Sequence, residues 1–165
     1  MEIKELPLEE KYKKLYDGYI ISDIITRGFI KEMGLTDKYL DYSIKASKKM
    51  LPVVMGPVFK FLKMLAPGTA FKKIIEYFME DEQLMEPVSN IEIVSLSDRE
   101  AVVKVKNSVT FEKYRDTIKS TGIDLDVREI WELNSKAYKE TAKDFGVDWT
   151  YKLEKDGWTH IVKLR

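Results

Sequence analysis

The stretch DWTYKLEKDGWTHIVKL, residues 148–164, decides the predicted fold because apolar and polar residues alternate on both sides of a turn signal. Alternation with a period of two predicts two half-buried strands. Asp156-Gly157 is the dipeptide preferred in a two-residue type I′ hairpin loop. A loop of that length pairs Leu153 with His160, Tyr151 with Val162, and Trp149 with Leu164.

These paired side chains all point to one face of the hairpin, which is apolar apart from His160. Asp148, Thr150, Thr159 and Lys163 point to the opposite face. A sheet with one apolar face is covered by helices on that side. We therefore expect helices to pack against the face that carries His160.

A second hairpin and two helices are predicted between Pro87 and Gly146. Residues 91–107, IEIVSLSDREAVVKVKN, are rich in β-branched side chains around a polar turn at 97–100. Helices are expected near 110–119 and 127–145, and the second should end at Gly146.

Apolar residues at helical spacing predict that the N-terminal half is helical. The first helix should cover 8–33, with Gly34 as its C-cap. A second helix should begin at Thr36, and Pro52 and Gly56-Pro57 should break the chain before a short helix at 58–65. The stripe of the last helix in this half consists of Phe71, Ile74, Ile75 and Phe78.

The order helices, hairpin, helices, hairpin predicts an α+β fold. N-terminal helices pack on a four-stranded antiparallel sheet made of two hairpins with a helical crossover. We expect a single domain over 1–165, with a helical half at 8–86 and a hairpin, helix, hairpin half at 88–165. A chain of 165 residues can bury roughly 70% of its extended surface on folding.

The composition argues against several classes of function. Lys plus Arg and Asp plus Glu each total 28, so no global basic field attracts nucleic acid. The chain has no cysteine, which excludes disulfides, thiolate catalysis and cysteine-ligated metals. The first 14 residues, MEIKELPLEEKYKK, lack the apolar core of a secretory signal, which predicts a cytoplasmic protein.

The second half of the chain resembles the 4-vinyl reductase domain superfamily, which includes the small TRAPP subunits and aminothiazoline-carboxylate hydrolase-like proteins. The resemblance covers about residues 90–165. The segments that carry it are NIEIVSLSDREAVVKVKNS (90–108), REIWELNSKAYKETAKDFGVD (128–148) and WTYKLEKDGWTHIVKL (149–164). It implies an apolar cavity between sheet and helices that accepts a small hydrophobic ligand, a porphyrin-like ring or an acyl chain.

Cysteines of the superfamily are replaced here by other residues. Their places are held by Asn107 and Ser108, Asn134, and His160. The thiol or metal chemistry of the superfamily therefore does not carry over, and we expect no cofactor and no metal site.

His160 is the only histidine, so any imidazole base must be this residue. The first interpretation is a partly buried ring with a local hydrogen bond. The alternative is a hydrolase of a small cyclic amide-like substrate, with His160 as base and Asn107, Ser108 and Asn134 as polar partners. Whether the protein is an enzyme stays open, and the shortage of catalytic groups favours a binding protein.

The leading hypothesis is a non-catalytic domain that binds an apolar or aromatic small molecule. Its abundant aromatic and methionine side chains are typical of a large pocket. The predicted ligand-binding residues are Phe59, Leu62, Trp131, Asn134, Trp149, Tyr151, Trp158 and His160.

An alternative hypothesis is an adaptor that uses the lysine-bearing apolar segment 52–66. Residues 37–75 hold eight lysines against Asp37 and Asp41, which suits peripheral contact with an anionic membrane or a protein partner. The chain could act as a homodimer in this role.

The acidic run that follows predicts a solvated helix end or, alternatively, a site for a hard divalent cation. Its members are Glu76, Glu80, Asp81, Glu82 and Glu86.

Overall fold

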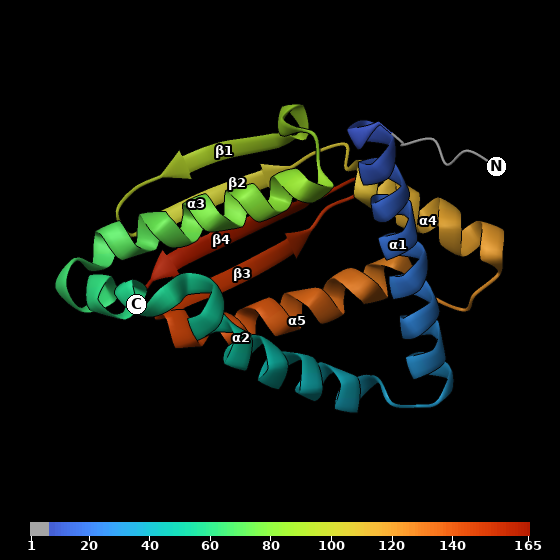
Figure 1. The fold of residues 1–165 in the computed structure, drawn as a ribbon, viewed down its shortest axis with the longest axis horizontal. Coiled ribbons are helices and arrows are strands. Elements are labelled where there is room, and N and C mark those ends of the chain that lie inside the picture. The colour runs from blue at the N-terminus through green and yellow to red at the C-terminus, as the bar shows by residue number, and fades with distance from the viewer. Residues whose placement is uncertain (1–6) are drawn as a thin grey trace.

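The computed structural model describes residues 7–165, and the side chains of residues 51–63 lie outside this description. Within this range the chain forms five α-helices, one 3-10 turn and four strands (Figure 1). In chain order they are α1 (Leu8–Glu32), α2 (Thr36–Leu65), α3 (Pro67–Met85), η1 (Val88–Asn90), β1 (Ile91–Leu96), β2 (Glu100–Val105), α4 (Val109–Thr121), α5 (Val127–Phe145), β3 (Val147–Leu153) and β4 (Trp158–Leu164).

The four strands form one antiparallel sheet in the order β1-β2-β4-β3. β2 of the first hairpin pairs with β4 of the second, and Val103 lies opposite His160. The helices α4 and α5 connect the two hairpins (Figure 1). The predicted α+β fold, with two hairpins and a helical crossover, is confirmed.

The register predicted for the last hairpin is wrong by two residues. Tyr151 lies opposite His160. The backbone N–H of Glu154 donates to the carbonyl of Gly157 at 2.9 Å, so the loop lies one residue earlier than predicted. A shift of two residues leaves every side chain on its predicted face, because side chains alternate with a period of two.

Gly157 is required by packing against β2. A Cβ built on Gly157 would lie 2.1 Å from the carbonyl oxygen of Val105, so no other residue fits without movement. The neighbouring carbonyl of Asp156 accepts a hydrogen bond from the backbone N–H of Ser108 at 2.9 Å. The glycine therefore permits close approach of two backbones, which a hairpin signal read from the sequence does not reveal.

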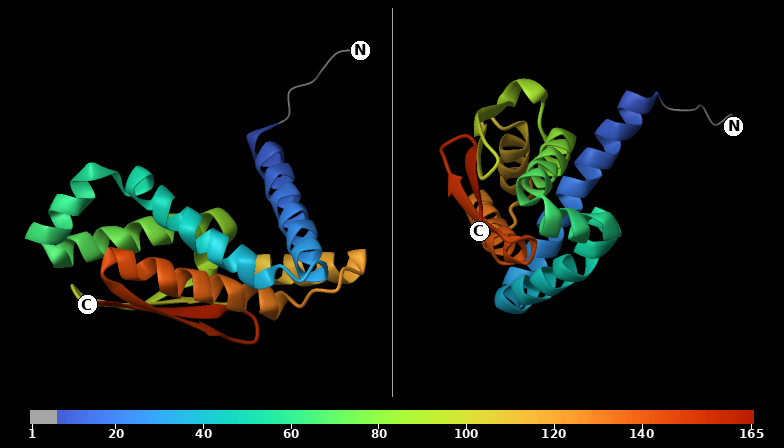
Figure 2. Two further views of the ribbon diagram at one scale, coloured as in Figure 1. Left: turned by 90° about the horizontal axis from the view of Figure 1, so that it is seen from below. Right: turned by 90° about the vertical axis from the view of Figure 1, so that its left-hand side faces the viewer.

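The helices cover one face of the sheet in two layers. α3 and α5 pack directly on the strands, and α2 lies across both of them (Figures 1 and 2). α1 crosses one end of the assembly and contacts α4 and α2. The space enclosed by α1, α2, α3 and α5 is where the candidate site lies.

The buried side chains form two clusters on the helical face of the sheet. The first joins α1, α4 and α5 to the loop end of β4, and it is centred on Trp131 and Trp158. The second joins α3 to the middle of the sheet. It contains the whole predicted stripe of Phe71, Ile74, Ile75 and Phe78, which is confirmed as core.

The end of α1 was predicted correctly, whereas the course of α2 was not. Gly34 has φ of 66° and follows α1 as expected. The predicted break at Pro52 and Gly56-Pro57 is wrong, because a single helix runs from Thr36 to Leu65. The ribbon of α2 changes direction along its second half (Figure 2), since an interior proline removes one backbone hydrogen bond and bends a helix that continues past it.

Candidate functional site

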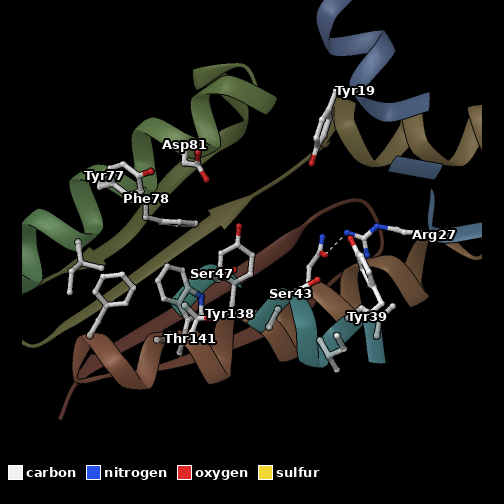
Figure 3. A pocket seen from close by; sticks show the side chains of 18 residues that line it. Tyr19, Arg27, Tyr39, Ser43, Ser47, Tyr77, Phe78, Asp81, Tyr138 and Thr141 are labelled. Atoms are coloured by element: carbon white, nitrogen blue, oxygen red, sulfur yellow. Dashed lines mark hydrogen bonds between the residues drawn. The ribbon is translucent and has the colours of Figure 1, made fainter. Parts of the chain in front are cut away.

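A cleft of about 440 Å³ opens between α1, α2, α3 and α5, and we call it the α2-side cleft. Figure 3 shows Tyr19 and Asp81 approaching it from α1 and α3, and Tyr138 from α5. Its aromatic lining consists of Tyr19, Tyr39, Tyr77, Phe78, Tyr138, Phe145 and Trp149. Its polar lining consists of Arg27, Ser43, Ser47, Asp81, Asn134 and Thr141.

A second cleft of about 310 Å³ lies towards α4, and we call it the α4-side cleft. Tyr19, Asp81, Asn134 and Tyr138 line both clefts, so the two are adjoining parts of one hollow. The side chains found only in the α4-side cleft are Glu82, Leu84, Met85, Thr110, Tyr114, Trp131, Tyr151 and Trp158.

His160 lies beneath this hollow and is fully buried. Its Nδ1 accepts a hydrogen bond from Nε1 of Trp149 at 3.0 Å, so the neutral ring carries its proton on Nε2. The ring centroids of Phe78 and Tyr151 lie 4.5 and 4.7 Å from the imidazole, both edge-on. The interpretation of His160 as a buried ring with a local hydrogen bond agrees with this geometry.

Glu82 is the acidic neighbour of His160. Its Oε1 lies 3.4 Å from Nε2 of His160, longer than a normal N–H···O hydrogen bond, and Nε2 has no hydrogen-bond partner among the described residues. Only 11% of the Glu82 side chain is exposed. The prediction of a solvated acidic helix end is therefore wrong for Glu82, because α3 turns this carboxylate inward one helical turn after Phe78.

Glu86 is also buried, with 3% exposure, and corrects the same prediction. Its carboxylate accepts hydrogen bonds from the hydroxyl of Ser108 at 2.5 Å and from the backbone N–H groups of Val109 and Thr110 at 3.1 Å. These donors belong to the first turn of α4, where the helix dipole also stabilises a negative charge. Glu86 therefore joins the end of α3 to the start of α4.

A polar network built on Arg27 holds α1 against α4, α5 and α2. Nε of Arg27 donates to Asp23 at 2.7 Å, and Nη2 donates to Oδ1 of Asn134 at 3.0 Å. The hydroxyl of Tyr114 donates to the same Asp23 carboxylate at 2.9 Å. The guanidinium carbon lies 5.8 Å from the centre of the Tyr39 ring, within the range of a cation–π contact.

Two buried tyrosines and Asp81 keep their protons more firmly than usual. Burial raises the pKa of the Tyr151 and Tyr114 hydroxyls well above the ordinary value. Desolvation also raises the pKa of Asp81, at the mouth of the hollow. At neutral pH these tyrosines are therefore protonated, and the hydroxyl of Tyr114 is the donor to Asp23.

Five of the eight predicted ligand-binding residues line the hollow. Trp149 lines the α2-side cleft, Asn134 lines both, and the α4-side cleft contains Trp131, Tyr151 and Trp158. His160 packs beneath them, and the side chains of Phe59 and Leu62 lie outside the described residues.

Two of the polar side chains proposed as partners of a catalytic His160, those of Asn134 and Ser108, bond to other groups. Asn134 accepts from Arg27. Ser108 caps α4, and its Oγ accepts from the backbone N–H of Phe111 at 2.9 Å. Asn107 occupies the left-handed backbone region, with φ of 49°, and its carbonyl accepts from the side chain of Asn90. Among the described residues, the only side-chain hydrogen bond of His160 is the one from Trp149.

Tyr138 and Arg27 were missed from the sequence, and Asp81 and Glu82 were named only as members of the acidic run, not as lining of a cleft. For Glu82 a signal existed, because positions 71, 75, 78 and 82 share one face of a helix. Arg27 follows Asp23 by four residues, the spacing of a helical ion pair. Nothing local in the sequence indicates that Tyr138 faces a hollow.

No protein-family model, curated protein or solved structure matches this chain. Among residues 7–165, no helix is long and apolar enough to cross a membrane. In the same range, no group of three or more His, Asp or Glu side chains converges on a point where a metal ion could bind.

Proposed function

We propose that this protein is a non-catalytic module that binds an aromatic small molecule in the hollow formed by the α2-side and α4-side clefts. The observation that supports it most is the lining: aromatic rings and hydroxyls from α1, α2, α3 and α5 converge above the helical face of the sheet. The resemblance to the 4-vinyl reductase domain superfamily implies a ligand at this place in the fold.

The dimensions of the hollow suit such a ligand. Pockets that hold drug-sized molecules measure roughly 300–1,000 Å³ and combine apolar walls with a few oriented polar groups. Tyr19, Tyr77 and Tyr138 are exposed by 55%, 45% and 36%, so their rings are accessible from solvent. A ligand that covers these rings would gain the free energy of apolar burial.

The hydrolase alternative receives less support. A general base must reach the proton that it removes, whereas His160 is fully buried and its Nδ1 is bonded to Trp149. Ser108 caps α4, and the carbonyl of Asn107 accepts from the side chain of Asn90. A binding function needs none of these groups to react.

The proposal is tested by native mass spectrometry of the purified protein, followed by thermal-shift screening with neutral, anionic and cationic aromatic compounds. A ligand that binds the folded state raises the melting temperature by mass action. The variant Ala137→Trp fills the α2-side cleft from α5 and should abolish the shift. Lys139→Trp adds the same ring to an exposed position of α5 and should leave the shift unchanged. The absence of any co-purified or stabilising compound would contradict the proposal.

The adaptor remains a second candidate because of the end of α2. Met64 and Leu65 are exposed by 71% and 76%, and Lys45, Lys49 and Lys72 are also exposed. In this role the segment 52–66 would contact an anionic membrane, with sedimentation on vesicles that depends on phosphatidylserine and weakens with salt. Leu65→Glu should abolish that sedimentation. Light scattering of the purified protein tests the homodimer.

A further inference from the structure

The charged groups of the hollow are few and unbalanced. Among the described residues, the charged side chains that line the two clefts are Arg27, Asp81 and Glu82. Arg27 already pairs with Asp23, at 2.7 Å. Among the described residues neither Asp81 nor Glu82 forms an ion pair with a lysine or arginine; the basic side chain beside Glu82 is His160, at 3.4 Å. The lining therefore carries excess negative charge.

Glu82 is the more deeply placed of the two acids. Its side chain is 11% exposed, and the 3.4 Å separation from Nε2 of His160 leaves that atom without a hydrogen bond. A carboxylate removed from water is costly unless a counter-charge or good donors replace its hydration. A positive group in the α4-side cleft would supply this compensation.

Aromatic rings share the α4-side cleft with this carboxylate. Tyr138, Tyr151, Trp131 and Trp158 line the α4-side cleft together with Glu82. The face of an aromatic ring carries partial negative charge and attracts cations, most strongly when the ring is tryptophan. Sets of rings of this kind are how proteins recognise ammonium and quaternary ammonium groups. The rings and the carboxylates therefore both favour a positively charged ligand.

We infer that the ligand is an organic cation, whose ammonium or quaternary ammonium group lies in the α4-side cleft beside Glu82 and Asp81 and whose apolar or aromatic body extends into the α2-side cleft. This inference rests on the proposed function. Tyr19, Asn134 and Tyr138 line both clefts. The clefts therefore adjoin, and a single molecule can contact both.

Three indoles that differ only in the end group test the sign of the ligand. Tryptamine is a cation, tryptophol is neutral and indole-3-propionate is an anion at neutral pH. Isothermal titration of the full chain should give about tenfold tighter binding for tryptamine than for tryptophol, on the order of one cation–π and ion-pair contribution. Indole-3-propionate should bind most weakly, since it meets two carboxylates.

Substitutions that remove the charge of an acid but keep its shape test whether the preference for tryptamine arises from Glu82 and Asp81. Glu82→Gln and Asp81→Asn should each reduce the preference for tryptamine over tryptophol, while the affinity for tryptophol stays nearly constant. Glu80→Gln removes the same charge from an exposed position of α3 outside the clefts and should leave the preference intact. Asp81 lies at the exposed rim, so its variant remains informative if Glu82→Gln does not fold.

The outcomes separate this inference from the proposed function. If tryptophol or indole-3-propionate binds as tightly as tryptamine, or if the screen yields only neutral or anionic ligands, the cation inference is overturned and the binding function stands. If no compound of any charge binds, both fail. A preference for tryptamine that Glu80→Gln removes as strongly as Glu82→Gln would place the effect outside the clefts and would also overturn the inference.

Discussion

Trp149 donates its indole N–H to Nδ1 of His160 at 3.0 Å, and this bond ties the only histidine of the chain to a residue that lines the α2-side cleft. The bond crosses from β3 to β4 on the helical face of the sheet. His160 therefore supports the position of Trp149, one of the rings that a ligand would touch.

Replacement of His160 should affect stability first. His160→Asn removes a buried ring and leaves the indole N–H of Trp149 without its acceptor, so we expect the free energy of unfolding to fall by about 2–4 kcal/mol. Urea denaturation measures this change. Lys152→Asn, at an exposed position of β3, should change it by less than about 1 kcal/mol. Unchanged stability of His160→Asn would contradict the packed role.

Gly157 and Gly18 form a matched pair. Gly157→Ala should lower the free energy of unfolding by about 2 kcal/mol or more, because its Cβ would lie 2.1 Å from the carbonyl oxygen of Val105. A methyl group at Gly18, inside α1, would instead extend into open space. Gly18→Ala should therefore stabilise the protein by roughly 0.5–1 kcal/mol. Equal effects of the two substitutions would contradict the close approach of Gly157 to the backbone of Val105.

Glu86 should behave as a buried structural carboxylate. Glu86→Gln keeps the shape of the side chain but replaces the carboxylate, which accepts three hydrogen bonds at the start of α4, with a neutral amide. We expect the free energy of unfolding to fall by about 1–3 kcal/mol. Chemical denaturation provides the measurement. Glu80→Gln on the exposed side of α3 serves as the control, with a change within about 0.5 kcal/mol.

Alkaline pH should unfold the protein through its buried tyrosines. Burial raises the pKa of Tyr151 above its ordinary value of 10.0. The unfolded state then loses this proton at lower pH than the folded state, so the contribution of Tyr151 to stability is constant below about pH 10 and falls as the pH rises further. Denaturation midpoints between pH 8 and 11 should show a smaller decline for Tyr151→Phe than for the native chain. Tyr42→Phe, at a position 71% exposed, should retain the full decline.

The sequence predicts the architecture well because the spacing of apolar residues along a strand or helix indicates which of its faces is buried. Alternation in 148–164 assigned the faces of β3 and β4, and a register error of two residues did not disturb them. The stripe from Phe71 to Phe78 assigned the buried face of α3. These signals are local, since each depends only on the spacing of side chains within one element.

The burial of Glu86 and the close approach at Gly157 were not predicted because each depends on a contact between elements that are distant in sequence. A glycine is required at position 157 because the backbone of Val105 lies against it. Glu86 is buried because the start of α4 supplies its hydrogen-bond donors. Neither partner can be identified from a run of neighbouring residues. The tryptophans and Asn134 of the hollow were predicted from composition and resemblance, whereas Tyr138 and Glu82 required the arrangement of α3 against α5.

The indole N–H signals of the three tryptophans test the binding site most directly, because Trp131, Trp149 and Trp158 all line the two clefts. Titration of the ¹⁵N-labelled chain with tryptamine should shift all three indole signals in a saturable manner. Backbone amides of Thr150, Lys152 and Lys163, exposed positions of the sheet, should stay in place. Saturable binding that moves the amides of the sheet and leaves the three indole signals unshifted would contradict a ligand site in the hollow.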